Sequence, residues 1–151
     1  MAATPQDQAP AEADSTPQFS AVVAAVPSTA TLGSSEPNSK YMFEIRFSSR
    51  GASISKVTLS RFKGRFDKTR QLDLLSPLKT ADGGELSSMA TGPFAMLDQG
   101  ISLPFEQLDW FGGRPVTGDD GTQSIAYTAS VKRPDTGEVI QLAKTYTVRP
   151  G

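Results

Sequence analysis

Apolar and polar residues alternate most clearly between Tyr41 and Phe47, where the sequence reads YMFEIRF. One parity carries the apolar side chains Tyr41, Phe43, Ile45 and Phe47, and the other carries Met42, Glu44 and Arg46. A period of two is typical of a β-strand that buries one face. The pattern therefore predicts a half-buried strand over residues 41–47.

A sharp SSRG break at residues 48–51 separates this strand from a second one. Its glycine is suited to a positive φ, which costs other residues steric energy. In the second strand Ile54 has one parity, whereas Val57 and Leu59 have the other. A regular strand cannot bury both sets on one face, so we expect a β-bulge near Ser55–Lys56 and burial of Leu59 beyond it.

The last part of the chain predicts a β-hairpin. Its first strand alternates through Ile125, Tyr127, Ala129 and Val131, and its second through Ile140, Leu142, Lys144, Tyr146 and Val148. The sequence RPDTG at residues 133–137 lies between them and has the residues that a tight turn requires.

Shorter elements are expected between these two regions. Strand candidates are Gln71–Leu75, a weaker Met89–Leu97 broken by Gly92-Pro93, and an edge strand at Ile101–Phe105. Loops are expected at residues 81–84, 112–115 and 118–121. No amphipathic helix of three turns appears, so the sequence predicts an all-β fold, an antiparallel twisted β-sandwich.

Composition divides the chain into two parts. Residues 1–39 hold five of the eleven prolines and no basic residue, which predicts a flexible leader. Residues 40–151 hold all fifteen basic residues and twelve acids, and we expect them to form the β-sandwich domain. The apolar stretch Phe19–Val26 could dock weakly as a strand or short helix, but a slightly apolar piece of linker is the favoured interpretation.

The residue types that are missing narrow the chemistry. The chain has no cysteine and no histidine, so disulfides, thiolate metal sites and histidine-dependent catalysis are excluded. It has no P-loop, dinucleotide-binding or Gly-x-Ser-x-Gly motif. Its net charge of −1 argues against a dedicated nucleic-acid binder. We therefore expect no cofactor, no metal and no catalytic residue, and no window is apolar enough to span a bilayer.

Five segments of the chain resemble a known family. They are the lead-in LGSSEP at residues 32–37, the turn of Ser49, Arg50, Gly51 and Ala52, the LLSP of residues 74–77, Ser87–Leu97, and the closing residues 140–151. Their order and wording are similar to the start of the extracytoplasmic domain of YidC-type membrane protein insertases, in particular the planctomycete-like branch. The resemblance covers roughly residues 32–151.

This resemblance implies a fold, a location and partners. The domain would be a large β-sandwich of mutarotase-like topology, here a partial copy that is incomplete at its C-terminus. It would lie on the periplasmic side of the bacterial inner membrane, tethered by a transmembrane helix outside this chain. It would be non-catalytic and would contact membrane protein substrates and components of the Sec translocon.

A basic cluster follows the second strand. Its members are Arg61, Lys63, Arg65, Lys68 and Arg70, opposed by Asp67 and interleaved with Phe62 and Phe66. One interpretation is contact with anionic lipid headgroups, worth about 1 kcal/mol per basic residue near the surface. The favoured alternative is a solvated hairpin whose two phenylalanines fold back to the core.

A second cluster holds the aromatic residues Phe105, Trp110 and Phe111 beside Glu106 and Asp109. Such residues could form a shelf for a sugar or peptide, but capping of the sandwich core is the favoured interpretation. A carbohydrate-binding domain and a cell-surface adhesion domain thus remain alternatives to the insertase domain.

Acidic residues elsewhere have simpler interpretations. Asp119-Asp120-Gly121 is expected to be a turn, because a calcium loop needs more spaced oxygen ligands. The scattered acids Glu44, Glu85, Asp98, Glu106 and Asp109 have no motif that would pair them for glycoside hydrolysis.

Overall fold

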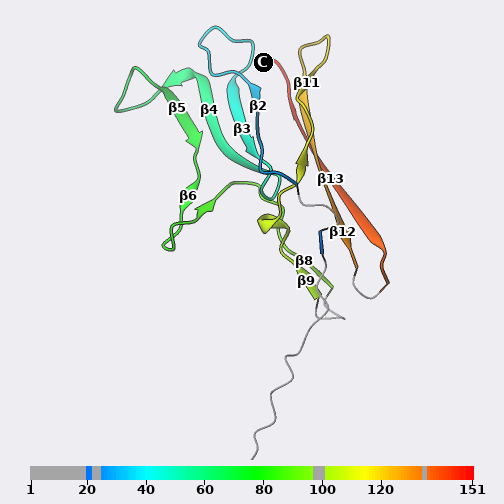
Figure 1. Cartoon of the computed structure of the whole chain (residues 1–151). Coiled ribbons are helices and arrows are strands. Elements are labelled where there is room, and N and C mark those ends of the chain that lie inside the picture. The colour runs from blue at the N-terminus through cyan, green and yellow to red at the C-terminus, as the bar shows by residue number, and fades with distance from the viewer. Residues whose placement is uncertain (1–19, 22–24, 97–100, 134–135) are drawn as a thin grey trace, which may run out of the picture.

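Strands dominate the computed structural model of the chain, which describes residues 20–21, 25–96, 101–133 and 136–151. Within these ranges the only helical element is a short 3₁₀ helix, Phe105–Gln107. The strands form two main antiparallel sheets and two small hairpins (Figure 1).

The first sheet has four strands, ordered as in the sequence. They are β2 (Thr29–Gly33), β3 (Phe43–Ser48), β4 (Ser53–Lys63) and β5 (Gln71–Leu75). All neighbouring pairs are antiparallel, and β3 and β4 are joined by the four-residue turn 49–52.

The predicted β-bulge is confirmed. Arg46 lies opposite Lys56, but the next residue, Phe47, lies opposite Ile54, so Ser55 is an extra residue in β4. This extra residue brings Ile54 and Val57 onto the same face, where their exposed fractions are only 7% and 6%. The change of parity in the sequence therefore corresponds to the β-bulge in the strand.

The expected burial of Leu59 is wrong. Leu59 lies opposite Phe43, and both residues are only partly buried. Exposure increases along β4 towards Lys63, because the strand runs beyond the region where the core covers it. A loss of about 2–5 kcal/mol, which applies to a large core side chain, is therefore not expected at Leu59.

The second sheet is organised around one long strand. β12 (Gln123–Lys132) pairs over its whole length with β13 (Val139–Val148), as the predicted hairpin requires. Residues 134–135 of the turn lie outside the described part of the chain. The other edge of β12 is shared by three short strands, β1 (Ser20–Ala21), β10 (Phe111–Gly112) and β11 (Val116–Thr117).

Two small hairpins complete the fold. β6 (Leu78–Lys79) pairs with β7 (Glu85–Leu86), and β8 (Phe94–Met96) pairs with β9 (Ile101–Leu103). The predicted loop at residues 81–84 connects β6 to β7. The expected strand at residues 101–105 ends at Leu103, because Pro104 leads into the 3₁₀ helix.

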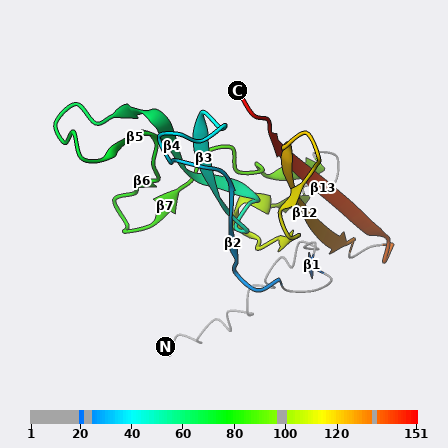
Figure 2. The ribbon, with the colours of Figure 1, turned by 90° about the horizontal axis from the view of Figure 1, so that it is seen from above.

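The core lies between the two main sheets, which confirms the all-β antiparallel sandwich (Figures 1 and 2). Phe47 of β3 contacts Tyr127 of β12 and Tyr146 of β13, with ring centroids 6.4 and 4.7 Å away. The inward residues of the hairpin are as predicted, since Ile125, Tyr127, Ala129 and Val131 are all buried.

The sheets take in residues that the sequence analysis assigned to the flexible leader. β2 pairs with β3 over five residues, and its Leu32 is completely buried. The prediction that residues 1–39 lack structure is therefore wrong for Thr29–Gly33. The run does alternate, with Ala30 and Leu32 on the core side, but it is only five residues long and follows a proline-rich segment, so its structure depends on pairing with β3.

The apolar stretch Phe19–Val26 also reaches a sheet. Ser20 and Ala21 pair with Lys132 and Val131 at the edge of β12, so docking as a strand, not the linker interpretation, describes these two residues. Residues 1–19 and 22–24 lie outside the described part of the chain, and the prediction for them stays a prediction.

Candidate functional site

The five basic residues of the first cluster lie at one end of the β4–β5 hairpin. We call residues 61–70 the basic tip. All five basic side chains are exposed. In both Figure 1 and Figure 2 the loop between β4 and β5 extends away from the two sheets.

The phenylalanines of the basic tip do not fold back to the core, which corrects the favoured sequence interpretation. Phe66 is 96% exposed and Phe62 is 56% exposed. The guanidinium of Arg65 lies 5.7 Å from the centre of the Phe66 ring. The physical reason is that the core cluster does not reach this part of the hairpin, so no second layer is available to receive the two rings.

The one acid of the basic tip is engaged within its own loop. The carboxylate of Asp67 accepts hydrogen bonds from the hydroxyl and the backbone N–H of Thr69. The hydroxyl bond is the main reason why the pKa of Asp67 is lowered. Five basic residues and one ionised acid leave the basic tip with a net charge of +4.

The turn between β3 and β4 is held by hydrogen bonds to two distant segments of the chain. Buried Ser49 accepts a hydrogen bond from the backbone N–H of Ser28 and donates one to Asp109, both at 2.9 Å. Its backbone N–H donates to the Ser28 carbonyl, and its carbonyl accepts from the N–H of Trp110. Ser49 thus joins the start of the first sheet to the segment after the 3₁₀ helix.

Gly51 and Ala52 complete this turn with backbone conformations that few residues adopt. Their φ angles are +63° and +45°. The N–H of Gly51 donates to the carbonyl of Leu108, 2.8 Å away. A β-carbon at Gly51 would lie 3.1 Å from the Cα of Glu106, so the predicted positive φ is accompanied by a close backbone contact.

Gly51→Ala is expected to lower the free energy of unfolding by about 2–3 kcal/mol, from a left-handed conformation and a close contact together. Gly83→Ala is the matched control, because Gly83 has a φ of +83° and no atom within 4 Å of its added β-carbon. It should lose only the conformational part, about 1 kcal/mol. Urea unfolding measures both losses, and equal losses would show that the contact with Glu106 does not matter.

The aromatic cluster does not form a ligand shelf. Phe105 and Trp110 are buried, with ring centroids 5.7 Å apart, and the indole N–H of Trp110 donates to the carbonyl of Phe105. Phe111 alone is exposed, at 48%. Phe105 and Trp110 thus belong to the core, and a stacking site that uses all three rings is not present.

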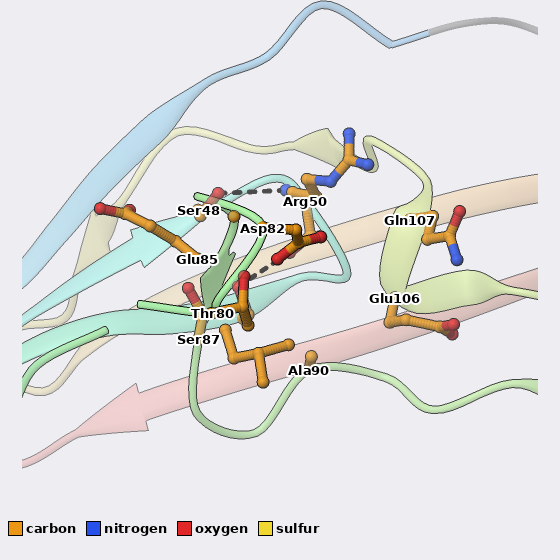
Figure 3. Close-up of a pocket in the computed structure, with 12 residues that line it drawn as sticks. Ser48, Arg50, Thr80, Asp82, Glu85, Ser87, Ala90, Glu106 and Gln107 are labelled. Carbon is orange, nitrogen blue, oxygen red and sulfur yellow. Dashed lines mark hydrogen bonds between the residues drawn. The ribbon is translucent and has the colours of Figure 1, made fainter. Parts of the chain in front are cut away.

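A cavity of about 550 Å³, lined mostly by polar residues, lies beside the β3–β4 turn (Figure 3). The β6–β7 hairpin contributes Asp82 and Glu85, the 3₁₀ helix contributes Glu106 and Gln107, and the turn contributes Arg50. No aromatic residue lines this cavity. It can offer hydrogen bonds to a small polar ligand, but it lacks the ring face on which a sugar would stack.

Of the five scattered acids, Glu85 and Glu106 line the same cavity, whereas Glu44 and Asp109 are engaged elsewhere. Asp109 accepts from Ser49, and Glu44 pairs with Arg46 at 3.1 Å. Asp98 lies outside the described residues. No group of three potential metal ligands was found among the residues that the structure describes.

The Asp119–Gly121 segment is a turn, as the sequence predicted. The Asp120 carboxylate accepts hydrogen bonds from the backbone N–H and the hydroxyl of Thr122, at 2.8 and 2.7 Å. The backbone bond is the largest cause of the lowered pKa of Asp120. The carbonyl of Gly121 accepts the hydroxyl of Tyr41 at 2.6 Å, which ties the turn to the first sheet.

Sequence reasoning missed an apolar edge of the first sheet. Three exposed leucines lie on its edge strand β5, namely Leu72, Leu74 and Leu75, and two more, Leu78 and Leu86, lie on the separate β6–β7 hairpin. β5 is the last strand of its sheet and pairs only with β4 among the described strands. The sequence alternates from Gln71 to Leu74 but not beyond, because Leu75 follows Leu74 directly, and this break indicates that the leucines do not share one face.

Comparison of the chain with models of protein families, with curated proteins and with solved structures finds no significant match. No helix in the described part of the chain has the length and apolar character needed to cross a membrane.

Proposed function

We propose that the chain belongs to the extracytoplasmic β domain of a YidC-type insertase. In this role it is non-catalytic and supports the insertion and folding of membrane proteins as a contact module. The observation that carries the proposal is that three segments with family-like wording, far apart in the sequence, meet at one place in the fold.

These contacts centre on the β3–β4 turn. The hydroxyl of Tyr146, in the closing segment, donates to the carbonyl of Ala52 at 2.6 Å. The N–H of Thr91, in the Ser87–Leu97 segment, donates to the carbonyl of Gly51 at 2.8 Å. Ser88 also exchanges two backbone hydrogen bonds with Ile54, at 2.8 and 2.9 Å. The three family-like segments are thus joined to one another by hydrogen bonds.

Lys144 joins the same arrangement. Its ammonium group donates to the carbonyl of Met89 and to the hydroxyl of Thr91. Partial burial lowers the pKa of Lys144. A Lys-Thr-Tyr sequence at residues 144–146 therefore has a structural role, since Lys144 and Tyr146 both contact the segment that follows β7. These contacts between the family-like segments support the proposal more than sequence similarity in separate segments would.

The apolar edge of the first sheet is the surface that best suits a contact module. An exposed edge strand can add an extended peptide through main-chain hydrogen bonds, and its side chains select the partner. On β5 the side chains of Leu72, Leu74 and Leu75 are all exposed. We place the contact with emerging chains or translocon components on this edge.

Photo-crosslinking in the full-length protein tests this function. A crosslinking residue at Leu74 is expected to capture an emerging membrane protein chain or a Sec translocon component in bacterial membranes. Val116 provides the control position, because its exposed fraction of 63% is close to the 59% of Leu74 but it lies on the other sheet. The reading frame should also encode an apolar segment of about 20 residues upstream and several downstream.

Two outcomes would contradict the proposal. One is a reading frame with tandem copies of this domain and no apolar segments, which would favour a cell-surface adhesion protein. The other is equal crosslinking at Leu74 and Val116, which would mean that the β5 edge has no special role.

A further inference from the structure

The basic tip has a shape that sets it apart from the rest of the surface. Its residues form the end of a two-stranded arm, and Phe66 lies in the loop between the strands. The N–H of Gly64 donates to the carbonyl of Arg70, and the N–H of Arg70 donates to the carbonyl of Asp67. These bonds hold the loop closed, so its side chains are presented on a defined turn.

Most of the charge of the basic tip is not neutralised by the residues that the structure describes. Among the described residues, Arg61, Lys63 and Lys68 form no ion pair. The nearest acid outside the tip, Asp73, is engaged by Lys56 at 3.0 Å and by the hydroxyl of Thr58 at 2.8 Å. The positive charge is therefore available to an external anionic surface.

The exposed ring of Phe66 adds an apolar side chain among the basic residues of the tip. The ring of Phe66 is 96% exposed, so its transfer from water into an apolar phase would be favourable. Phe62 and Phe66 alternate with basic residues, so both kinds of side chain occur along the same arm. Basic and aromatic residues together suit the boundary between lipid headgroups and acyl chains.

The size of the basic tip favours a bilayer over a protein partner. A stable protein interface covers about 800 Å² on each partner and draws on about 20–30 residues. The tip has only ten residues, and the hollow beside it has a volume of about 360 Å³, so it offers too little surface for an interface of that size. A lipid surface imposes no such requirement, because headgroups can rearrange around a small basic loop.

We propose that the basic tip docks on an anionic lipid bilayer, with its basic side chains at the headgroups and Phe66 inserted between them. The proposal does not depend on the insertase assignment. An insertase domain with this property would hold its first sheet at a fixed orientation to the membrane surface.

Vesicle co-sedimentation of the 151-residue chain tests the proposal. Binding is expected to vesicles of phosphatidylglycerol and phosphatidylcholine, and not to phosphatidylcholine alone. It should weaken strongly in 1 M salt, where the Debye length falls to about 3 Å. Arg65→Ala with Lys68→Ala should reduce affinity about 30-fold, which corresponds to about 1 kcal/mol for each basic residue. Phe66→Ser should reduce it about tenfold or more, because the ring no longer enters the interface.

Matched control variants distinguish binding by the basic tip from a general effect of positive charge or exposed aromatic rings. Lys79→Ala with Arg114→Ala removes the same charge from exposed positions outside the tip, and Phe111→Ser removes another exposed ring. Both controls should bind vesicles within twofold of the unchanged chain, and all variants should keep its circular dichroism spectrum.

Three results would overturn the proposal. Equal binding to neutral and anionic vesicles would exclude the electrostatic contact. Equal losses in the control variants would show that the tip is not the site. Tighter binding of a single-stranded oligonucleotide or an acidic polypeptide than of anionic vesicles, at the same salt concentration, would assign the surface to that class of partner instead.

Discussion

Trp110→Ala is expected to lower the free energy of unfolding by about 3–5 kcal/mol, the range for removing a large aromatic side chain from a core. Trp110 is 1% exposed and packs on Phe105. Its removal would leave a cavity where the segment after the 3₁₀ helix meets the β3–β4 turn, and would leave the carbonyl of Phe105 without its indole partner. Urea unfolding followed by far-UV circular dichroism measures the change.

The neighbouring residue provides the control for this substitution. Phe111 is 48% exposed, so Phe111→Ala should cost less than about 1 kcal/mol. If the two substitutions cost the same, the placement of Trp110 in the core would be contradicted, and a surface cluster of aromatic residues would again be the better interpretation.

Leu32→Ala is expected to lower the free energy of unfolding by about 2–5 kcal/mol, although Leu32 precedes the first strongly alternating strand. Leu32 is completely buried, and it contributes to the core from the edge strand β2. The same unfolding measurement applies. A loss of this size would show that the cooperative fold starts before residue 40.

Leu74→Ala is the matched control for Leu32→Ala, because Leu74 is 59% exposed on the opposite edge of the same sheet. It should change the unfolding free energy by about 0.5 kcal/mol or less. No loss at Leu32 would mean that β2 adds little to stability and that the flexible leader does extend to this point.

The elements that sequence reasoning predicted correctly are those with a local cause. The closing hairpin follows from two alternating runs with turn-forming residue types between them. The bulge at Ser55 follows from a change of parity within a single strand. In both cases the residues that decide the structure lie within a few positions of one another, so the sequence pattern contains the necessary information.

The features that sequence reasoning missed depend on partners far along the chain. β2 has one core leucine and becomes a strand because β3 provides its hydrogen bonds. Trp110 and Phe111 are adjacent aromatics, and only the direction of the backbone after the 3₁₀ helix decides which one enters the core.

Some features of the candidate site were likewise evident from the sequence, and others depended on partners far along the chain. The charge of the basic tip was evident, because its five basic residues lie within ten positions. The exposure of Phe62 and Phe66 was not, since it depends on where the second sheet stops covering the first. The apolar β5 edge was also missed, because only the strand order shows that β5 has a free side.

The way in which the early residues are fixed has a consequence for the order of folding. Ser20 pairs with Lys132, the N–H of Gly33 donates to the side chain of Gln123, and the hydroxyl of Tyr41 donates to the carbonyl of Gly121. Contacts between residues so distant in sequence form slowly, because a long loop must close before they gain any energy. During synthesis the first sheet can form its own hairpins, but its apolar face has no cover until residues 123–148 have left the ribosome. The sandwich therefore closes after its last hairpin is made, and throughout that interval the buried side of β3 and β4 remains open to chaperones.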